Sequence, residues 1–254
     1  MSGQAGAAEI VLDHVSKAFG RADSAEAFRA VDDLSLAIAP GELVAILGKT
    51  GCGKSTIFNM IAGLGAPTEG SVLVQGYDPF RSFDALRGKI AIVFQSDRLL
   101  PWRTAIGNVE LGLDMLDVPR EERRKIAQLW LSRLGLSGHE RDYPHALSGG
   151  MRQRVSIARA FATDANILLC DEPFSALDEI TAQRLREEFV ALVRLNRKTG
   201  VFITHSINEA LQVGDRIVVL RRPARVAYDV RITRDGMADE QKTIRKRIEK
   251  ILTE

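Results

Sequence analysis

Cysteine is scarce in this sequence, with only Cys52 and Cys170 among 254 residues. Two cysteines so far apart exclude a disulfide-built scaffold and a metal site of the C-x-x-C type. Long hydrophobic runs are also lacking. The longest have about five residues, whereas a transmembrane helix needs roughly 18. The first ten residues lack a basic cluster and an apolar stretch, so we expect no secretory signal and a chain that does not itself cross a membrane.

An excess of either charge is absent as well. Thirty-five Lys and Arg residues oppose 33 Asp and Glu residues, which gives a formal net charge of +2. So small a charge does not favour a dedicated nucleic-acid-binding protein. The composition, 45% hydrophobic and 27% charged, is that of a globular protein and excludes a disordered one. The length allows one large domain or two small ones.

Four short apolar segments share one design. They cover residues 43–47, 90–94, 167–170 and 201–204. Continuous apolar strands are typical of a parallel sheet that is covered on both faces. Ligands of such sheets bind beyond the carboxyl ends of the strands. We therefore predict an α/β fold in which the residues that follow these strands face a ligand, and those residues are Gly48, Gln95, Asp171 and His205.

Further strands are predicted at residues 10–19, 34–38 and 217–220, with a polar, turn-rich insertion at 20–27. About 70 residues between the second and third apolar segments have a mostly helical pattern. This stretch is too long for an ordinary crossover, so we expect a helical subdomain inserted at 96–160. Within it, residues 120–134 carry apolar side chains at helical spacing, namely Ile126, Leu129, Trp130 and Leu134.

A last helix is predicted at residues 239–252, where Ile244, Ile248 and Ile251 share one helical face. We treat residues 231–254 as a C-terminal helical tail.

The segment after the first apolar strand matches the pattern G-x-x-x-x-G-K-[ST]. Its glycines let several backbone N–H groups point at phosphate oxygens, and the helix predicted at 54–64 directs its positive end at the same anion. Lys54 is predicted to contact the β- and γ-phosphates, and the Ser55 hydroxyl to bind Mg²⁺. The alternative is a chance glycine-rich turn. The predicted nucleotide-binding residues are Gly48, Lys49, Thr50, Gly51, Cys52, Gly53, Lys54, Ser55 and Thr56.

An acidic pair, Asp171 and Glu172, follows the third apolar segment. Asp171 is predicted to hold Mg²⁺, as the second acidic anchor of a P-loop NTPase does. Glu172 is predicted to polarise the water that attacks the γ-phosphate. The alternative is an acidic pair that merely begins a helix near Pro173.

Residues 147–154 read L-S-G-G-M-R-Q-R. Together with the phosphate loop, this stretch resembles the signature motif of the ATP-binding cassette (ABC) ATPases. Other segments resemble that family's motifs in the same order: VFQ the Q-loop, ILLCDE Walker B, SALD at 175–178 the D-loop, and ITHS the switch region. The resemblance covers residues 9–230. It implies a P-loop NTPase core with a mainly parallel sheet, an N-terminal antiparallel β subdomain and the inserted helical subdomain.

The resemblance also implies roles for single residues, with ATP and Mg²⁺ as cofactors. Glu172, His205 and Lys54 are expected to be catalytic. Gln95 joins Ser55 and Asp171 as an expected Mg²⁺ ligand. Phe19 resembles the aromatic residue that stacks on adenine. Phe28 competes for that role, and plain core packing of Phe19 remains an alternative.

The signature residues Ser148, Gly149 and Gly150 open a predicted helix whose apolar face includes Val155, Ala158 and Phe161. A helix start with bare N–H groups is an anion site. The resemblance implies a head-to-tail homodimer, in which Ser148 of one copy caps the γ-phosphate held by Lys54 of the other. The alternative is that Ser148 only caps its helix.

Residues 93–102, VFQSDRLLPW, resemble the ATPases of bacterial importers for nitrate, sulfonate, taurine and related small anions. In that family this region touches the membrane permease. We therefore expect Leu99, Leu100 and Trp102 to form an apolar partner surface, unless they fold into the helical subdomain.

The implied function is ATP hydrolysis that drives a permease from the cytoplasmic face of the inner (cell) membrane, served indirectly by a substrate-binding protein. No nucleic-acid partner is expected. The alternatives are an ABC ATPase not coupled to transport and a non-catalytic regulatory nucleotide-binding module.

Overall fold

The computed structural model describes residues 8–20, 28–233 and 238–253. It forms two compact units, one of Met1–Leu86 with Val193–Glu254 and one of Arg87–Leu192, which we call unit 1 and unit 2. Apart from Gly20, the insertion predicted at 20–27 lies outside the described residues. In the part of the chain that is described, no helix has the length and apolar character needed to span a bilayer.

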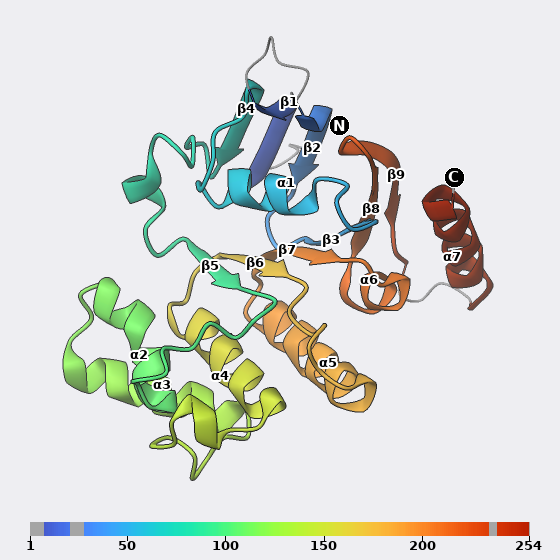
Figure 1. Ribbon diagram of the computed structural model, residues 1–254. Helices are drawn as coiled ribbons and strands as arrows, with labels where there is room; N and C mark the ends of the chain where they lie inside the picture. The colour runs from blue at the N-terminus through green and yellow to red at the C-terminus, as the bar shows by residue number, and fades with distance from the viewer. Residues whose placement is uncertain (1–7, 21–27, 234–237, 254) are drawn as a thin grey trace, which may run out of the picture. The chain divides into compact units, whose positions relative to one another are not determined.

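Unit 1 contains a three-stranded antiparallel sheet (Figure 1). Strand β1 (Ile10–Phe19) lies between β2 (Phe28–Ile38) and β4 (Glu69–Val74). This confirms the predicted antiparallel β subdomain. Strand β2 begins at Phe28 and not at residue 34, and β4 was not predicted. The first three residues of β4 are exposed, so its sequence lacks the apolar alternation that signals a half-buried strand.

The second sheet of unit 1 carries the phosphate loop. Its strands follow the order β7 (Thr199–Thr204), β3 (Leu43–Gly48), β8 (Arg216–Arg221) and β9 (Arg225–Arg231). Strand β3 runs parallel to β7 and β8, whereas β9 is antiparallel to β8. Every residue of β3 and β7 is buried, as continuous apolar strands require when both faces are covered.

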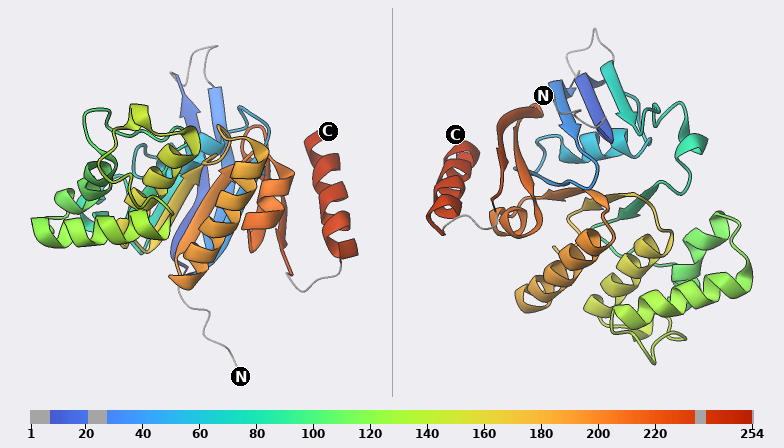
Figure 2. Two further views of the ribbon diagram at one scale, coloured as in Figure 1. Left: turned by 90° about the horizontal axis from the view of Figure 1, so that it is seen from below. Right: turned by 180° about the vertical axis from the view of Figure 1, so that it is seen from behind.

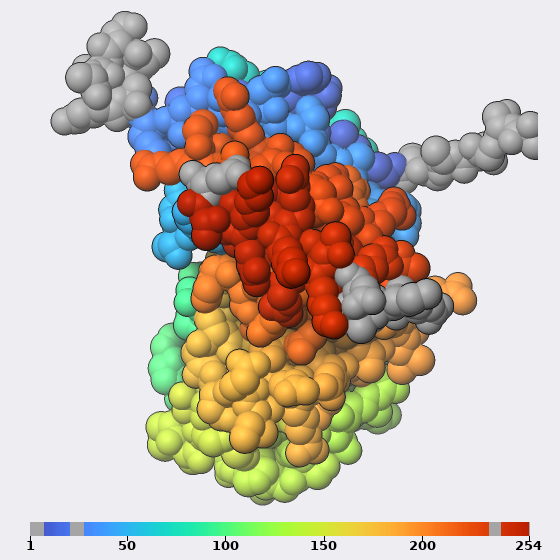
Figure 3. Space-filling view, turned by 90° about the vertical axis from the view of Figure 1, so that its right-hand side faces the viewer, coloured from blue at the N-terminus to red at the C-terminus, as the bar shows by residue number. Residues whose placement is uncertain are grey.

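Three helices complete unit 1. Helix α1 (Lys54–Ile61) contacts both sheets of the unit, and α6 (Ile207–Val213) lies against β3 and β7 (Figure 2). Helix α7 (Ala238–Thr253) lies beside β8 and β9 on the surface of this unit, as Figure 3 shows.

The amphipathic pattern of α7 is confirmed. Ile244, Ile248 and Ile251 are buried in one cluster with residues of β3, α6 and β8. We expect Ile248→Ala to lower the free energy of unfolding by about 2–5 kcal/mol, because it empties a fully buried site. Urea unfolding followed by circular dichroism measures this. The exposed neighbour Arg247→Ala is the control and should change stability by less than about 0.5 kcal/mol. Equal effects of both substitutions would contradict the packing.

Unit 2 contains two parallel strands and a group of helices. Strands β5 (Ile90–Val93) and β6 (Ile167–Asp171) pair in parallel. Helices α2, α3 and α4 pack on one another (Figure 1). This confirms an inserted helical subdomain, while its bounds at 96–160 stay a prediction. The helices span Ala105–Met115 (α2), Arg120–Arg133 (α3), Gly149–Ala162 (α4) and Glu179–Leu195 (α5), the last extending past the end of the unit.

Aromatic side chains fill the core of unit 2. The ring of Phe161 lies 5.1 Å from Trp130 and 5.9 Å from Phe189, measured between centroids. Helix α3 confirms the helical spacing predicted for residues 120–134, and Leu129, which is 49% exposed, lies outside its buried stripe. The buried stripe of α3 runs through Ala127, Trp130 and Leu131 instead. Trp130 belongs to both the predicted apolar set and the buried stripe, and it packs against Phe161.

Candidate nucleotide site

The phosphate loop connects β3 to α1 in unit 1. Lys54 is buried, and its Nζ donates hydrogen bonds to the carbonyl oxygens of Gly48 at 2.7 Å and Lys49 at 3.1 Å. The ammonium group therefore holds the start of the loop against the start of the helix. A positive charge inside a curled backbone loop is suited to a phosphate group.

Two glycines make this curl possible. Gly51 and Gly53 have φ values of 78° and 108°, in the left-handed region that favours glycine. A Cβ on Gly53 would also lie 2.7 Å from the Cβ of Ala224 and would strike the carbonyl oxygen of Ala30. The first amides of a helix have no intrahelical acceptor, so the start of α1 is a built anion site. The loop thus fits the triphosphate of a nucleotide.

Cys52 is a packing residue of the loop. Its side chain is buried, and its Sγ lies 2.6 Å from the point where a Cβ on Gly48 would stand. Burial raises the pKa of this thiol above its ordinary value, despite the opposing charge of Lys54. The thiol therefore stays protonated near neutral pH, and its reactivity is low.

His205 lies at the same sheet edge as the phosphate loop. Strands β3 and β7 are parallel neighbours with Leu47 paired to Thr204, so Gly48 and His205 both follow paired residues. The phosphate loop and His205 therefore both begin at the same level of the sheet edge, as predicted for the carboxyl ends of parallel strands.

A network that the sequence did not reveal fixes the chain around His205. The buried Thr204 hydroxyl donates to the carboxylate of Glu209 at 2.5 Å and accepts from the amide of Ser206 at 2.9 Å. The Ser206 hydroxyl in turn accepts from the amide of Glu209 and caps α6. In the sequence, the only sign of this network was Thr204, a polar residue at the end of an apolar strand.

Phe19 and Phe28 face each other across β1 and β2, where they are a register pair. Their side chains are 49% and 40% exposed. A cation lies near each ring: Lys17 Nζ is 5.3 Å from the Phe19 centroid, and Arg222 Cζ is 5.1 Å from that of Phe28. Exposure argues against core packing for either ring, and the choice between them as an adenine partner stays open.

In unit 2 the residues after β5 and β6 also meet at one edge. Val93 pairs with Cys170, so Gln95 and Glu172 each stand two residues beyond a paired position. Asp171 is the last residue of β6 and is half-buried. Glu172 has a φ of 45°, a strained conformation for a residue with a side chain. Such strain is found most often at functional sites.

The D-loop segment forms a tight turn after Glu172. The Ser175 amide and hydroxyl both donate to the carbonyl oxygen of Glu172, at 3.2 and 3.0 Å. Asp178 accepts from the amide of Thr181 at 3.0 Å at the start of α5, and this bond lowers the pKa of its carboxyl group. The turn therefore holds Glu172 between a buried strand and a capped helix.

The signature residues begin α4. Ser148 is the N-cap, and its hydroxyl accepts from the amide of Met151 at 3.3 Å. Ser148 and Gly149 are exposed, and Gly150 is half-buried. The predicted apolar face is confirmed, with Val155, Ala158 and Phe161 all buried. The cap satisfies one amide and leaves the helix start open to solvent.

The chain after Gln95 is bonded to the signature helix, a link that the sequence did not show. Asp97 accepts from Arg152 Nε at 2.9 Å. The guanidinium of Arg159 donates to the carbonyl oxygens of Asp97 and Arg98, both at 2.8 Å. Burial lowers the pKa of Arg159, but the group stays charged. Movement of this loop and of α4 is therefore coupled inside unit 2.

The predicted apolar patch near residue 100 is only partly present. Leu99 is buried and Leu100 is half-buried, so neither forms an open surface. Trp102, however, is 71% exposed. Buried Asn108 bonds the backbone of Leu100 in both directions and draws this loop onto α2. Of the three predicted side chains, Trp102 is the one that is exposed enough to form a contact with a partner protein.

The sequence-predicted site residues are thus divided between the two units. Unit 1 holds the phosphate loop, His205 and Phe19, and unit 2 holds Gln95, Asp171, Glu172 and the signature. Among the described residues, no group of three or more His, Cys, Asp and Glu side chains could bind a metal by itself. Mg²⁺ is commonly bound by one or two carboxylates together with substrate phosphates. The phosphate loop of unit 1 provides a serine hydroxyl and unit 2 provides the Asp171 carboxylate, and each is an oxygen donor of the kind that Mg²⁺ uses.

A sequence profile of the ABC transporter family matches residues 31–175, more than half of the chain. The chain belongs to the ABC transporter family. An uncharacterised ABC transporter ATP-binding protein of Methanocaldococcus jannaschii is 43% identical over 229 residues, which cover 88% of this chain and 84% of the relative.

Other relatives of this ABC protein carry named activities. The taurine import ATP-binding protein TauB of Yersinia pestis is 44% identical over 191 residues, covering 75% of this chain and 73% of the relative. The nitrate import ATP-binding protein NrtC of Synechococcus elongatus is 40% identical over 213 residues. These cover 83% of this chain and 32% of NrtC, so this chain spans about a third of that relative.

Solved ABC cassettes share the fold. A dimeric structure of the cassette MJ0796 in a post-hydrolysis state, bound to ADP and phosphate, superposes with a TM-score of 0.76. Its sequence is 36% identical, and the match covers 88% of this chain and 99% of that one. The fold is therefore that of an ABC ATPase, and this protein is an ATPase that binds ATP with Mg²⁺.

Proposed function

We propose that this chain is the ATP-hydrolysing subunit of a membrane importer for a small anion such as nitrate, a sulfonate or taurine. Two copies would close head to tail around two ATP molecules, and hydrolysis would reopen them. The observation that carries the proposal is that one chain holds two anion-ready helix starts, at Lys54 and at the exposed Ser148. Dimeric cassettes among the structural neighbours support the pairing of copies.

The residues divide the work as follows in this proposal. The phosphate loop binds the β- and γ-phosphates through its amides and Lys54. Ser55, Gln95 and Asp171 hold Mg²⁺, which when bound offsets the negative charge of the phosphates. Glu172 orients and polarises the attacking water. His205 stabilises charge that develops on the γ-phosphate. Ser148, Gly149 and Gly150 of the second copy cap that phosphate.

The partners in this proposal are a permease at the cytoplasmic face of the membrane and, indirectly, a substrate-binding protein. Relatives named for nitrate, taurine and bicarbonate support an importer of small anions. Exposed Trp102 offers an aromatic anchor for a permease. The domain division stays part of the proposal: an ATPase domain at 9–230 with its helical insertion at 96–160, and a tail at 231–254.

The dimer is tested by light scattering in ATP and Mg²⁺, using Glu172→Gln to slow turnover. We expect twice the 28.0 kDa mass of one chain. Adding Ser148→Arg should prevent this dimer, because the larger side chain blocks the approach of the opposing copy, and should leave nucleotide binding by the single chain intact. Ser137→Arg, at an exposed serine of the same unit, is the control. Dimers of undiminished stability in the Ser148→Arg protein would contradict the head-to-tail arrangement.

Coupling to transport requires a second experiment. The tagged chain is purified from membranes, its bound membrane protein is identified, and the complex is placed in vesicles with labelled nitrate or taurine. ATP-dependent accumulation of one anion supports the importer. Steady ATP turnover by a chain that captures no membrane protein would favour an ATPase that is not coupled to transport.

A further inference from the structure

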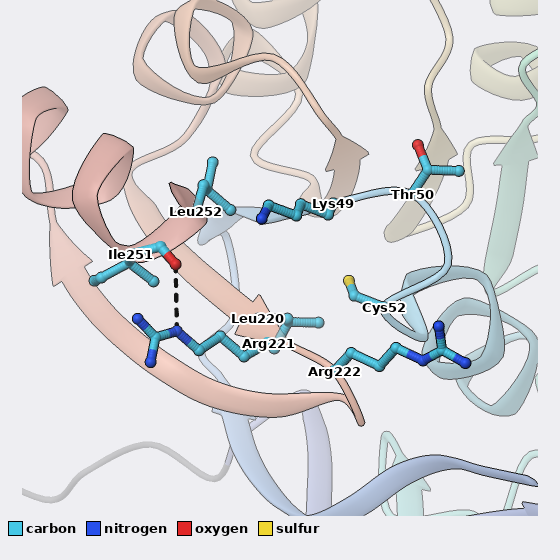
Figure 4. A pocket seen from close by; sticks show the side chains of 8 residues that line it. All are labelled: Lys49, Thr50, Cys52, Leu220, Arg221, Arg222, Ile251 and Leu252. Carbon is cyan, nitrogen blue, oxygen red and sulfur yellow. Dashed lines mark hydrogen bonds between the residues drawn. The ribbon is translucent and has the colours of Figure 1, made fainter. Parts of the chain in front are cut away.

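A pocket of about 340 Å³ lies beside the phosphate loop in unit 1 (Figure 4). The loop, the end of β8 and the last turn of α7 form its walls. Its lining residues are Lys49, Thr50, Cys52, Leu220, Arg221, Arg222, Ile251 and Leu252. Lys49, Thr50 and Cys52 belong to the predicted nucleotide-binding loop, whereas Lys54 and Ser55, the predicted phosphate and Mg²⁺ ligands, are not among the described lining residues. The pocket therefore adjoins the anion site at the start of α1.

Three of the lining side chains are cationic, and none of the eight described ones is acidic. Arg221 is oriented by a hydrogen bond from its Nε to the carbonyl oxygen of Ile251, at 3.3 Å. The guanidinium of Arg222 lies 5.1 Å from the centroid of the Phe28 ring. Figure 4 shows the Lys49 side chain reaching from the loop toward Leu252. Figure 4 shows the charged ends of Arg221 and Arg222 pointing to opposite sides, so the three cations do not meet at one point. Three cations without an acidic neighbour among the described lining residues still make the pocket positive, which favours an anion.

The remaining wall is apolar. Leu220 and Ile251 are buried, Leu252 is half-buried, and the Cys52 side chain faces them from the loop (Figure 4). An inorganic anion would use the cations and leave this wall in contact with water. An anion with a short hydrocarbon body uses both surfaces, and the volume is within the range of small-molecule sites.

We propose that this pocket binds a small organic anion, a carboxylate or sulfonate with a short apolar body, and that its occupancy changes the affinity for nucleotide. Lys49 provides the coupling. Its side chain lines the pocket, while its carbonyl oxygen accepts hydrogen bonds from Lys54 Nζ and from the amide of Cys52. An anion that attracts the Lys49 ammonium group therefore pulls on the phosphate loop, whose carbonyl oxygens bind Lys54. This site does not depend on the cargo or the permease.

Octane-1-sulfonate is the probe, titrated into the whole chain by calorimetry. We expect one molecule to bind per chain. Sulfate, which lacks the apolar body, and octan-1-ol, which lacks the charge, should each bind at least tenfold more weakly. The Arg221→Gln/Arg222→Gln protein should bind the probe at least tenfold more weakly, because both guanidinium groups are lost.

Matched controls separate this site from general attraction to a basic helix. Lys246→Gln/Arg247→Gln removes the same charge from exposed positions of α7 and should change probe affinity less than twofold. Equal probe affinity in the two double variants would overturn the site. Melting temperatures and binding of a non-hydrolysable ATP analogue verify that both variants are folded.

The coupling has its own readout. Saturating probe should change the affinity for the ATP analogue at least threefold in the unsubstituted chain and leave it unchanged in Arg221→Gln/Arg222→Gln. The analogue must then change probe affinity by the same factor. An unchanged nucleotide affinity would overturn the coupling. Full displacement of the probe by the analogue would place the probe in the nucleotide site and overturn the proposal.

Discussion

Glu172→Gln should bind ATP with unchanged affinity and hydrolyse it at least about a hundredfold more slowly, the loss expected when a positioned general base is removed. The amide keeps the shape of the carboxylate but accepts a proton poorly. The backbone of Glu172 is strained, with a φ of 45°, and is held by two hydrogen bonds from Ser175. The substitution leaves these backbone bonds in place, so the side chain should fail chemically and not structurally.

Phosphate release measures turnover, and a fluorescent ATP analogue measures affinity. Glu187→Gln removes a carboxylate from the exposed face of α5 and is the matched control, expected to turn over normally. If Glu172→Gln turns over at a near-normal rate while its melting temperature matches the parent protein, another group activates the water and the role assigned to Glu172 is wrong.

Lys54→Ala should lose ATP affinity by about a hundredfold. Lys54 is predicted to contact the β- and γ-phosphates of ATP. Losing one charge-assisted hydrogen bond to each phosphate, at about 1.5 kcal/mol per bond, costs about 3 kcal/mol of binding free energy, and 1.4 kcal/mol corresponds to a tenfold change in affinity. Lys54 is the buried cation at the centre of the loop. Equilibrium titration with the labelled analogue measures the loss, and Lys246→Ala on the exposed face of α7 is the control.

A second variant separates binding from loop collapse, because the carbonyl oxygens of Gly48 and Lys49 lose their donor in Lys54→Ala. Lys54→Gln retains an N–H donor for these oxygens without the charge. We expect it to bind ATP as poorly as Lys54→Ala while its melting temperature stays nearer the parent value. Undiminished affinity in Lys54→Gln would show that the positive charge is unnecessary.

The strands that carry site residues were predictable because burial on both faces produces continuous apolar runs. Strands β3, β5, β6, β7 and β8 were each found within two residues of their ends. Strands β4 and β9 were missed, since each exposes half or more of its residues and shows no such run. The phosphate loop was predictable because its backbone has positive φ values at Gly51 and Gly53, a conformation that favours glycine and so leaves a sequence pattern.

The side-chain hydrogen bonds that link one segment to another were not predictable. The bond of Arg152 to Asp97 joins positions 55 apart in sequence, and many other charged pairs were equally plausible beforehand. The hydrogen bond from the Thr204 hydroxyl to Glu209 left no sign in the sequence beyond the apolar strand that ends at Thr204. Leu99 was assigned to the surface because a loop was expected there, whereas the bonds of Asn108 to Leu100 draw that loop inward. Such choices depend on packing in three dimensions.

The position of α7 has a practical consequence for purification. Its last turn contributes Ile251 and Leu252 to the wall beside Lys49 and Thr50. An affinity tag fused behind this helix would emerge next to the phosphate loop, where a polyhistidine sequence or its bound nickel would meet ATP. A tag ahead of residue 8 leads into β1, whose first residue pairs with Ile38 and Val74, and is the better design for kinetic work.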